Sequence, residues 1–384
     1  MNDTLFDGWF DDSHRLFRAA CRRFAEEEIA PHAEEWEEAG GFPVELYAKA
    51  AEAGVLAPTF PTEVGGGGGD VFHGVVAGEE LQRGGSTGVV VGLGSLNIAL
   101  PPVLALGTDD QKARFARPVL AGRKIAALAI TEPGTGSDVA AVRTRAVRDS
   151  DGYRLSGSKT FITSGVRADL VTVLARTSDD PHHGLTFFVV ERGMPGFTVS
   201  RALRKTGWWA SDTAELQFDD VRVPVENRLG DEGSGFYALM RNFEGERLML
   251  AVNGCALAAL SLEHAERYAR DRTAFGRPLV GFQVTRHKLA DMATKVASAR
   301  ALTYTVADRL RRGQSVVAEV AMAKNHAAEV AREVTWEAVQ IFGGMGYMRE
   351  TVVERFARDA RLLPIGGGTS EIMREVIAKM GLGL

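Results

Sequence analysis

The chain has 384 residues, of which 45% are hydrophobic and 25% charged, and its formal net charge is −5. This length is enough for two or three domains, and the mixing of acids and bases along it argues against a basic face for nucleic acid. The only two cysteines, Cys21 and Cys255, fit no metal-ligand spacing or disulfide framework. We expect both to be inert core thiols.

The N-terminal sequence MNDTLFDGWFDDSHR is acidic and has neither the apolar core of a signal peptide nor an arginine-rich presequence. No apolar run is judged long enough to span a membrane, so we expect no integral membrane association. The expected location is the cytoplasm.

Residues 1–122 are expected to form an N-terminal helical domain. Its first helix is predicted by apolar residues that recur three and four apart: Leu16, Phe17, Ala20, Cys21 and Phe24. The glycine run at 65–69 lacks the Lys-Ser/Thr of a phosphate-binding loop, and no strand leads into it. We expect a flexible loop between helices there.

Residues 123–232 change to alternating and β-branched patterns, which predict a central β domain. The expected strands are Val171–Ala175, Leu185–Val190, Phe197–Val199 and Ala214–Val223. The short turns between them favour antiparallel pairing.

Residues 233–384 are expected to form a C-terminal helical bundle. Apolar residues continue there in steps of three and four for more than twenty residues, as in the seam of a long bundle helix. The seam consists of Leu289, Met292, Val296, Ala299, Thr303, Val306 and Leu310.

Two stretches carry the chemistry. Ala129–Asp138 (AITEPGTGSD) runs apolar and then turns at a proline and two glycines, where backbone can approach a flat polar ligand or an anion. Lys159–Gly165 (KTFITSG) places Phe161 and Thr163 on the same side of an extended strand. A ring to stack and a hydroxyl to hydrogen-bond suit a planar cofactor, although a glycine loop and a strand with one buried Phe would also explain them.

Both stretches resemble the flavin-binding signatures of the acyl-CoA dehydrogenases. The resemblance covers nearly the whole chain and continues in SDTAELQFDDVRVP (Ser211–Pro224), GFYALM (Gly235–Met240), ERLMLA (Glu246–Ala251), DRTAFGRPLVGFQ (Asp271–Gln283), QIFGGMGYM (Gln340–Met348) and GGGTSEIM (Gly366–Met373). It implies an α+β fold with N-terminal helices, a central antiparallel β-barrel and a C-terminal four-helix bundle.

The resemblance also implies an activity and partners. The expected reaction is FAD-dependent α,β-dehydrogenation of an acyl-CoA thioester to the trans-2-enoyl-CoA, as in fatty acid β-oxidation. The expected electron acceptor is an electron-transfer flavoprotein, and the expected assembly is a homotetramer with the flavin at a subunit interface.

By motif position, the resemblance assigns two groups of residues to non-covalent FAD. One group belongs to the protomer itself: Thr131, Gly136, Ser137, Phe161, Thr163, Thr369 and Glu371. The other would come from the neighbouring subunit: Arg272, Phe275, Gln283, Gln340, Gly343 and Gly344. Phe161, where many relatives carry Trp, would pack against the isoalloxazine, and Thr163 would hydrogen-bond near flavin N5, the atom that receives the hydride. Arg272 suits a pyrophosphate because a guanidinium pairs bidentately with phosphate oxygens.

The catalytic base departs from the commonest family pattern. Many members carry it in a C-terminal Tyr-Glu-Gly-Thr, but here residues 366–369 read Gly-Gly-Gly-Thr, so the usual base position is Gly367. Long-chain and isovaleryl members carry it on a bundle helix within Glu-Arg-Leu, which matches Glu246-Arg247-Leu248. We therefore expect Glu246 to be the base; the alternative is a surface glutamate paired with an arginine one turn away.

The resemblance gives the glycine loop a second role. The N–H of Gly367 would stabilise the developing enolate, and donors of this kind contribute roughly 3–4 kcal/mol in other enzymes. The alternative is a simple loop leading into a helix at Thr369–Lys379. Residues expected near the acyl-CoA are Ser137, Tyr237, Arg247, Gly367 and Gly368. For Tyr237 a role as a core aromatic is nearly as well supported.

Two other functions stay open at this point. One is a flavin oxidase or monooxygenase on the same fold, against which the retained Glu246 argues, because a flavin monooxygenase needs no base for an α proton. The other is a non-catalytic scaffold, against which the intact flavin motifs argue. The sequence does not determine the acyl chain that is oxidised.

Overall fold

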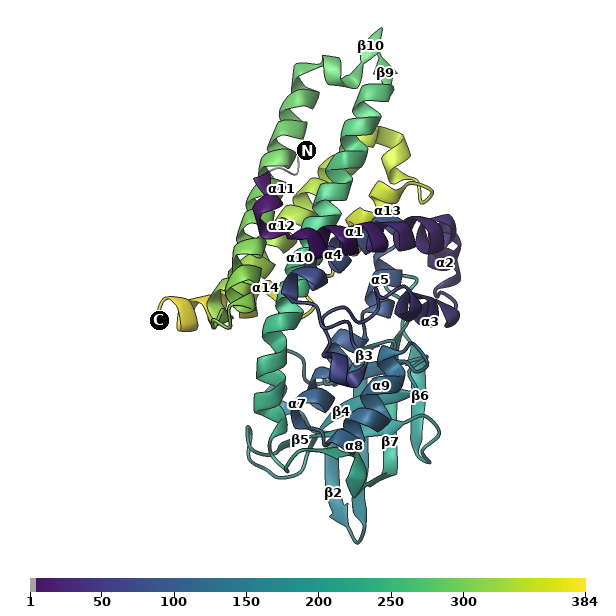
Figure 1. The fold of residues 1–384 in the computed structure, drawn as a ribbon, viewed down its shortest axis with the longest axis vertical. Coiled ribbons are helices and arrows are strands. Elements are labelled where there is room, and N and C mark those ends of the chain that lie inside the picture. The colour runs from purple at the N-terminus through teal and green to yellow at the C-terminus, as the bar shows by residue number, and fades with distance from the viewer. Residues whose placement is uncertain (1–4) are drawn as a thin grey trace.

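The computed structural model describes residues 5–384. Figure 1 shows three parts stacked along the long axis, with the sheet at the lower end, short N-terminal helices in the middle and long helices at the upper end. The helix α10 (Gly235–Asp271) runs from beside the sheet to the upper end, and its 37 residues correspond to about 55 Å. The family fold expected from the sequence is confirmed.

The N-terminal part is built from short helices. They are α1 (Asp12–Phe24), α2 (Ala33–Ala39), α3 (Glu45–Glu52), α4 (Val71–Glu80), α5 (Thr87–Leu93), α6 (Leu96–Ala99), α7 (Pro101–Leu106), α8 (Asp109–Gln111) and α9 (Arg117–Leu120).

Helices α1 and α4 are joined through their N-caps. Asp11 caps α1 by accepting the N–H of His14, and Asp70 caps α4 in the same way. The Nε2 of His14 lies 2.8 Å from Asp70 Oδ1, so the ring of His14 is buried with both nitrogens partnered. The predicted inward position of Leu16 was wrong: this side chain is 75% exposed, and His14 begins the buried face instead.

The glycine run at 65–69 is a closely packed loop, and the prediction of a flexible one was wrong. Its N–H groups donate to carbonyls of residues 57–62, at 2.8–3.0 Å. A Cβ at Gly66 would overlap with the backbone oxygen of Phe60. The glycines therefore allow one chain segment to lie directly on another.

The β domain is one eight-stranded sheet. Its strands are β1 (Ala126–Ala129), β2 (Arg145–Asp149), β3 (Gly152–Thr163), β4 (Leu170–Arg176), β5 (Leu185–Glu191), β6 (Phe197–Ala202), β7 (Thr213–Pro224) and β8 (Arg228–Leu229). The hydrogen-bonded order is β6-β7-β3-β2-β4-β5-β8, with β1 beside β4. All four predicted strands are present.

Antiparallel pairing dominates the sheet, as expected, but β4 pairs in parallel with β1 and, at one position, with β2. Strands β2 and β3 lie between β1 and β4 in the sequence, so β1 and β4 are joined by a long connection, as parallel pairing requires, and not by a hairpin. The hydrogen-bonded path ends at β6 and β8 within the described residues, so "barrel" describes the sheet only loosely.

The bundle consists of α10, α11 (Gln283–Arg311) and α12 (Val317–Phe342), with α13 (Val352–Ala360) and α14 (Ser370–Val376) packed beside it. The predicted seam of α11 is confirmed, since its members face the bundle core. Helices α10 and α12 approach closely at Gly254, where a Cβ would lie 2.9 Å from the backbone oxygen of Ala327. Cys21 and Cys255 are buried free thiols, and burial raises the pKa of each to about 12.

Two helical stretches, Thr87–Leu106 and Gly235–Asp271, are long and apolar enough to cross a membrane by length and composition alone. This corrects the expectation that no such run exists. Half of the apolar window of the first and two thirds of that of the second are buried inside the protein. Burial in a protein core accounts for their composition.

Candidate active site

A buried ion pair holds the two flavin-like motifs together. The ammonium of Lys159 on β3 donates to the backbone oxygen of Ile130 at 2.8 Å and to Glu132 Oε1 at 2.9 Å. The Glu132 carboxylate also accepts the N–H groups of Arg143 and Thr144 at 2.8 Å. Lys159 and Glu132 lie within the quoted motifs, but the sequence analysis did not single them out. A lysine is rarely buried without a partner, so a lysine within a strand expected to be buried could have indicated a nearby carboxylate.

Their pKa values follow from this contact. Burial lowers the pKa of Lys159 to about 8, although Glu132 opposes that shift. Burial alone would raise the pKa of Glu132, but Lys159 and the donors at Thr144 and Arg143 bring it below its ordinary value. Both groups are therefore held as an ion pair at neutral pH.

Phe161 lies at a β-bulge, and the expected regular strand around it was wrong. The pairing of β3 with β7 shifts register between Lys159 and Ile162, and Phe161 has a φ of 61°. A positive φ is strained for a non-glycine residue. The bulge leaves the ring 68% exposed, while Thr163 is half-buried at the end of the strand.

The surface around Phe161 fits a flat polar cofactor such as FAD. The turn before β2 is tied to β3 by the N–H of Thr160, which donates to the backbone oxygen of Thr131 at 2.9 Å. Gly136 and Ser137 on this turn are exposed, and a Cβ at Gly136 would meet no atom within 4 Å. An open glycine turn beside an exposed ring offers both backbone donors and a stacking face.

Glu246 lies on α10 facing the loop 366–368. Its Oε1 is 3.6 Å from the position that a Cβ at Gly367 would occupy. Within residues 5–384 it forms no ion pair, so the alternative of a surface glutamate paired with an arginine does not apply. Burial raises the pKa of Glu246, and the charges of Arg247 and Lys324 oppose the shift.

Two cations hold the glycine loop. Arg247 Nε donates to the backbone oxygen of Gly367 at 3.3 Å, and the Lys324 ammonium donates to that of Gly368. Gly367 and Gly368 have φ values of 64° and 95°, which side-chain-bearing residues rarely adopt. Lys324 was not identified from the sequence. A lysine within the apolar face of α12 could have indicated a buried charge with a specific partner.

Leu250 occupies the space that a side chain at position 367 would need. A Cβ built on Gly367 would overlap with Leu250 Cδ1. The glycines at 366–368 thus carry no carboxylate, and Leu250 from α10 places an apolar side chain beside Gly367.

The contact of Leu250 with Gly367 leads to a testable prediction about the base position. If Glu246 is the base of the expected dehydrogenation, Gly367→Glu in a Glu246→Gln variant is expected to restore little activity, because Leu250 must move aside and a side chain at position 367 is strained at a φ of 64°. Adding Leu250→Ala is expected to restore activity in part, because a carboxylate then reaches the same substrate carbon. The rate of anaerobic flavin reduction by an acyl-CoA measures both variants. Equal recovery with and without Leu250→Ala would contradict the prediction, and Glu246→Gln/Leu250→Ala is the matched control.

The second group of predicted FAD residues lies at the far end of the bundle. It comprises Arg272, Phe275, Gln283, Gln340, Gly343 and Gly344, all exposed. Stacking of Tyr268 on Phe342, with ring centroids 4.1 Å apart, brings the ends of α10 and α12 together. The hairpin of β9 (Thr273–Ala274) and β10 (Arg277–Pro278) stands at the opposite end of the molecule from the β domain (Figure 1). Within one protomer this group therefore does not meet the Phe161 surface.

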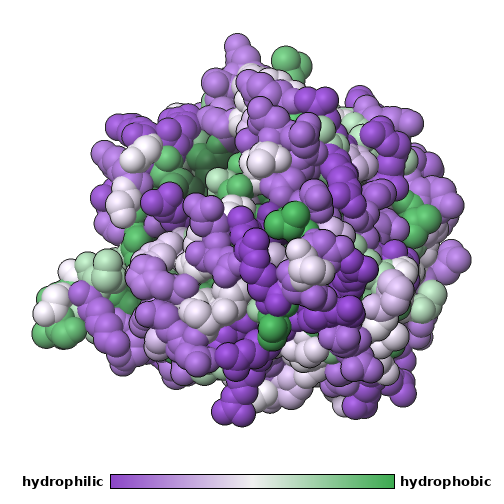
Figure 2. Space-filling model, turned by 90° about the horizontal axis from the view of Figure 1, so that it is seen from below, coloured by the Kyte–Doolittle hydropathy of each residue, from purple (hydrophilic) through white to green (hydrophobic). Residues whose placement is uncertain are grey.

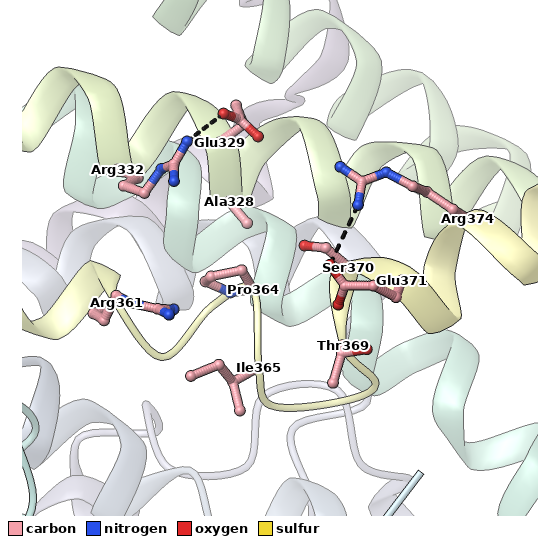
Figure 3. Close-up of a pocket in the computed structure, with 10 residues that line it drawn as sticks. All are labelled: Ala328, Glu329, Arg332, Arg361, Pro364, Ile365, Thr369, Ser370, Glu371 and Arg374. Atoms are coloured by element: carbon pink, nitrogen blue, oxygen red, sulfur yellow. Dashed lines mark hydrogen bonds and ion pairs between the residues drawn. The ribbon is translucent and has the colours of Figure 1, made fainter.

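Thr369 and Glu371 line a cavity of about 470 Å³ between α12 and α14 (Figure 3). Thr369 caps α14 by accepting the N–H of Ile372 at 3.3 Å, and Glu371 pairs with Arg374. Arg332 and Arg361 also line the cavity, so its wall carries hydroxyl and guanidinium donors.

Tyr237 lies in the first turn of α10 and is half exposed, with its ring 5.3 Å from that of His183. It is nine residues from Glu246, or roughly 13 Å along the helix. The alternative of a buried core aromatic therefore does not describe it.

Figure 2, which views the molecule from the β-domain end, shows a largely hydrophilic face with scattered apolar residues and a recess lined by apolar ones.

Three domain families match the chain in order. "Acyl-CoA dehydrogenase, N-terminal domain" matches residues 11–123, "Acyl-CoA dehydrogenase, middle domain" matches 127–221, and "Acyl-CoA dehydrogenase, C-terminal domain" matches 233–382.

Curated relatives match over almost the whole chain. An acyl-CoA dehydrogenase of Bacillus subtilis is 40% identical over 96% of this chain and 97% of its own length. A long-chain specific mitochondrial acyl-CoA dehydrogenase of Sus scrofa is also 40% identical, covering 96% of this chain and 86% of its own. A short-chain specific mitochondrial acyl-CoA dehydrogenase of Bos taurus is 40% identical, covering 96% of this chain and 89% of its own length. Long-chain and short-chain relatives are thus equally similar.

Solved structures agree with this result. A probable acyl-CoA dehydrogenase of Mycobacterium abscessus is 51% identical with a TM-score of 0.96, covering 97% of this chain and 99% of its own. A glutaryl-CoA dehydrogenase of Mycobacterium smegmatis, solved in complex with FADH2, is 28% identical with a TM-score of 0.92, over 99% and 97%. A chain from a structure entitled electron transferring flavoprotein of Acidaminococcus fermentans is 38% identical with a TM-score of 0.93, over 97% and 98%.

Proposed function

Because the chain belongs to the acyl-CoA dehydrogenase family and is an oxidoreductase, we propose that it dehydrogenates the Cα–Cβ bond of an acyl-CoA thioester with Glu246 as the base. One observation carries this assignment. Glu246 is a half-buried carboxylate whose pKa burial raises and which forms no ion pair within residues 5–384, and it faces a loop whose glycines replace the usual base. A carboxylate with a raised pKa is a stronger base once it is ionised.

Two groups of the protein act on the thioester: a carboxylate that removes a proton and a backbone N–H that stabilises the charge left behind. Glu246 takes the α proton, and negative charge then develops on the thioester carbonyl oxygen. The N–H of Gly367 lies on the facing loop and is the donor proposed to stabilise that charge. The enoyl product forms when the β hydrogen leaves as hydride.

FAD is the proposed cofactor, and bound FAD would supply the hydride acceptor. Phe161 would stack on its ring, and Thr131, Gly136, Ser137 and Thr163 would give polar contacts. The exposed ring and open glycine turn support this assignment. Thr369 and Glu371 would extend the site through the cavity beside α14.

A second subunit is proposed to complete the cofactor site. The exposed group around Arg272 and Gln340 stands apart from the Phe161 surface, and it includes or adjoins exposed apolar residues such as Phe275, at 96% exposure, and Tyr347. Large exposed apolar patches mark interaction surfaces. We propose a homotetramer, with an electron-transfer flavoprotein as the external acceptor and the cytoplasm as its location.

The test is an anaerobic titration of the purified protein with saturated acyl-CoAs of increasing chain length. A visible flavin band that bleaches on titration, with formation of enoyl-CoA, is the expected result. The acyl-CoA that bleaches it at the lowest concentration identifies the substrate class. A coloured protein that no acyl-CoA reduces, or a colourless one, would overturn the proposal. Rapid reoxidation of the bleached protein by oxygen would favour the oxidase alternative.

A further inference from the structure

Lys324 on α12 is a buried cation with no carboxylate in ion-pair contact in the described part of the chain. Its side chain is only 1% exposed, and within residues 5–384 it forms no ion pair. Its ammonium donates instead to the backbone oxygen of Gly368. Burying a charge is costly even when one hydrogen bond satisfies it, and an apolar residue at this position would pack in the bundle without that cost.

The contacts of Lys324 and Arg247 orient two successive peptide groups. Arg247 holds the carbonyl of Gly367 from α10, and Lys324 holds that of Gly368 from α12. In a planar trans peptide the N–H points opposite to the C=O. The N–H groups that follow, those of Gly368 and Thr369, are therefore turned away from the two cations.

The loop depends on these tertiary contacts for its shape. Glycines at positive φ have little local preference for one orientation of the peptide. Among the described residues, the N–H groups of Gly367, Gly368 and Thr369 donate to no protein acceptor. They are therefore free to donate to a ligand, and Glu246 lies on the same loop surface.

We propose that Lys324 is a positioning residue for dehydrogenation: by fixing the peptide group between Gly368 and Thr369, it holds the loop 366–368 in the shape that presents the N–H of Gly367 to the thioester carbonyl beside Glu246. This inference rests on the proposed function.

Three charged groups face Lys324. Arg247 carries the same charge and disfavours the protonated lysine, whereas Glu246 and Glu371 favour it; burial is the largest influence and lowers the pKa of Lys324 to about 8. The interaction with Glu246 is reciprocal, and Lys324 opposes the upward shift of the Glu246 pKa. Removing the charge is thus expected to move that pKa further upward.

Two variants separate the roles of Lys324. Lys324→Met removes both the hydrogen bond and the charge, while Lys324→Gln removes the charge but keeps a donor. The measurements are the pH dependence of anaerobic flavin reduction by an acyl-CoA that bleaches the parent, and hydrogen–deuterium exchange of a peptide covering 365–369. The matched control is Lys295→Met on α11, whose lysine is half exposed and paired with Glu333.

With Lys324→Met we expect FAD content near that of the parent, a roughly 10–100-fold slower reduction, as for a misplaced reacting group, and faster exchange of the loop. In both Lys324 variants the acid limb of the pH profile should move to higher pH, but Lys324→Gln should keep parent-like exchange. The control should change neither readout.

Parent-like rates, acid limb and loop exchange in Lys324→Met would overturn the inference. If Lys324→Met does not fold, Lys324→Gln provides the test. An acid limb at the parent's pH in Lys324→Gln would overturn the role of the charge. Parent-like reduction rates in Lys324→Gln would show that Lys324 contributes only to the stability of the fold. A parent that no acyl-CoA reduces is the separate failure of the proposed function.

Discussion

Replacing Glu246 by glutamine is expected to reduce the rate of dehydrogenation by roughly 10²–10⁴-fold, the usual contribution of a general base. Glutamine keeps the size of the side chain and its place beside Gly367, so FAD and acyl-CoA binding should persist. Stopped-flow measurement of flavin reduction gives the rate, and the bound flavin spectrum gives the cofactor content.

The pH profile of the parent tests the same assignment. Burial raises the pKa of Glu246 above its ordinary value near 4.5. Because the ionised carboxylate is the active form, the rate should rise with pH through that raised pKa and then level off. The limb should be absent from the residual activity of Glu246→Gln.

The control for this prediction is Glu244→Gln, which changes a second partly buried glutamate two positions earlier on α10. It should react at nearly the parent rate, because side chains two apart on a helix point to different faces. Activity of Glu246→Gln within a few-fold of the parent would exclude Glu246 as the base.

Replacing Lys159 by methionine is expected to lower the free energy of unfolding by about 3–5 kcal/mol, since it leaves the Glu132 carboxylate buried without its partner. The same change should release FAD, because the pair holds the glycine turn against β3. Urea unfolding monitored by circular dichroism, together with flavin content, measures both effects.

The double variant Lys159→Met/Glu132→Gln should recover part of the stability lost by Lys159→Met, because it removes the unpaired charge. Arg145→Met, which breaks an exposed pair between β2 and Asp179 in the turn after β4, should change little. A Lys159→Met protein as stable as the parent and fully loaded with FAD would contradict the prediction.

The pH dependence of stability follows from the lowered pKa of Glu132. Its contribution is complete above the ordinary value near 4.5 and is lost as the pH falls through the lower value in the folded protein. We expect the difference in stability between the parent and Glu132→Gln to shrink as the pH is lowered through this range.

Local patterns determined the secondary structure. Strands β4, β5, β6 and β7 were predicted within three residues at each end, and the seam of α11 was predicted from its spacing. These features depend on which residues are apolar and at what period, and both are properties of a short stretch of chain. Leu16 failed because apolar spacing alone did not anticipate a buried histidine with two hydrogen-bonded nitrogens.

The sequence by itself determined the family, the order of the three parts, the loss of the loop base at Gly367 and the candidate replacement, Glu246. Only the tertiary structure decided what surrounds that carboxylate. Glu246 and Gly367 are 121 positions apart, and the contacts of Leu250, Arg247 and Lys324 with the glycine loop join α10 and α12 to it. Sequence periodicity records the face of a helix, whereas the partner on that face is set by how the helices pack.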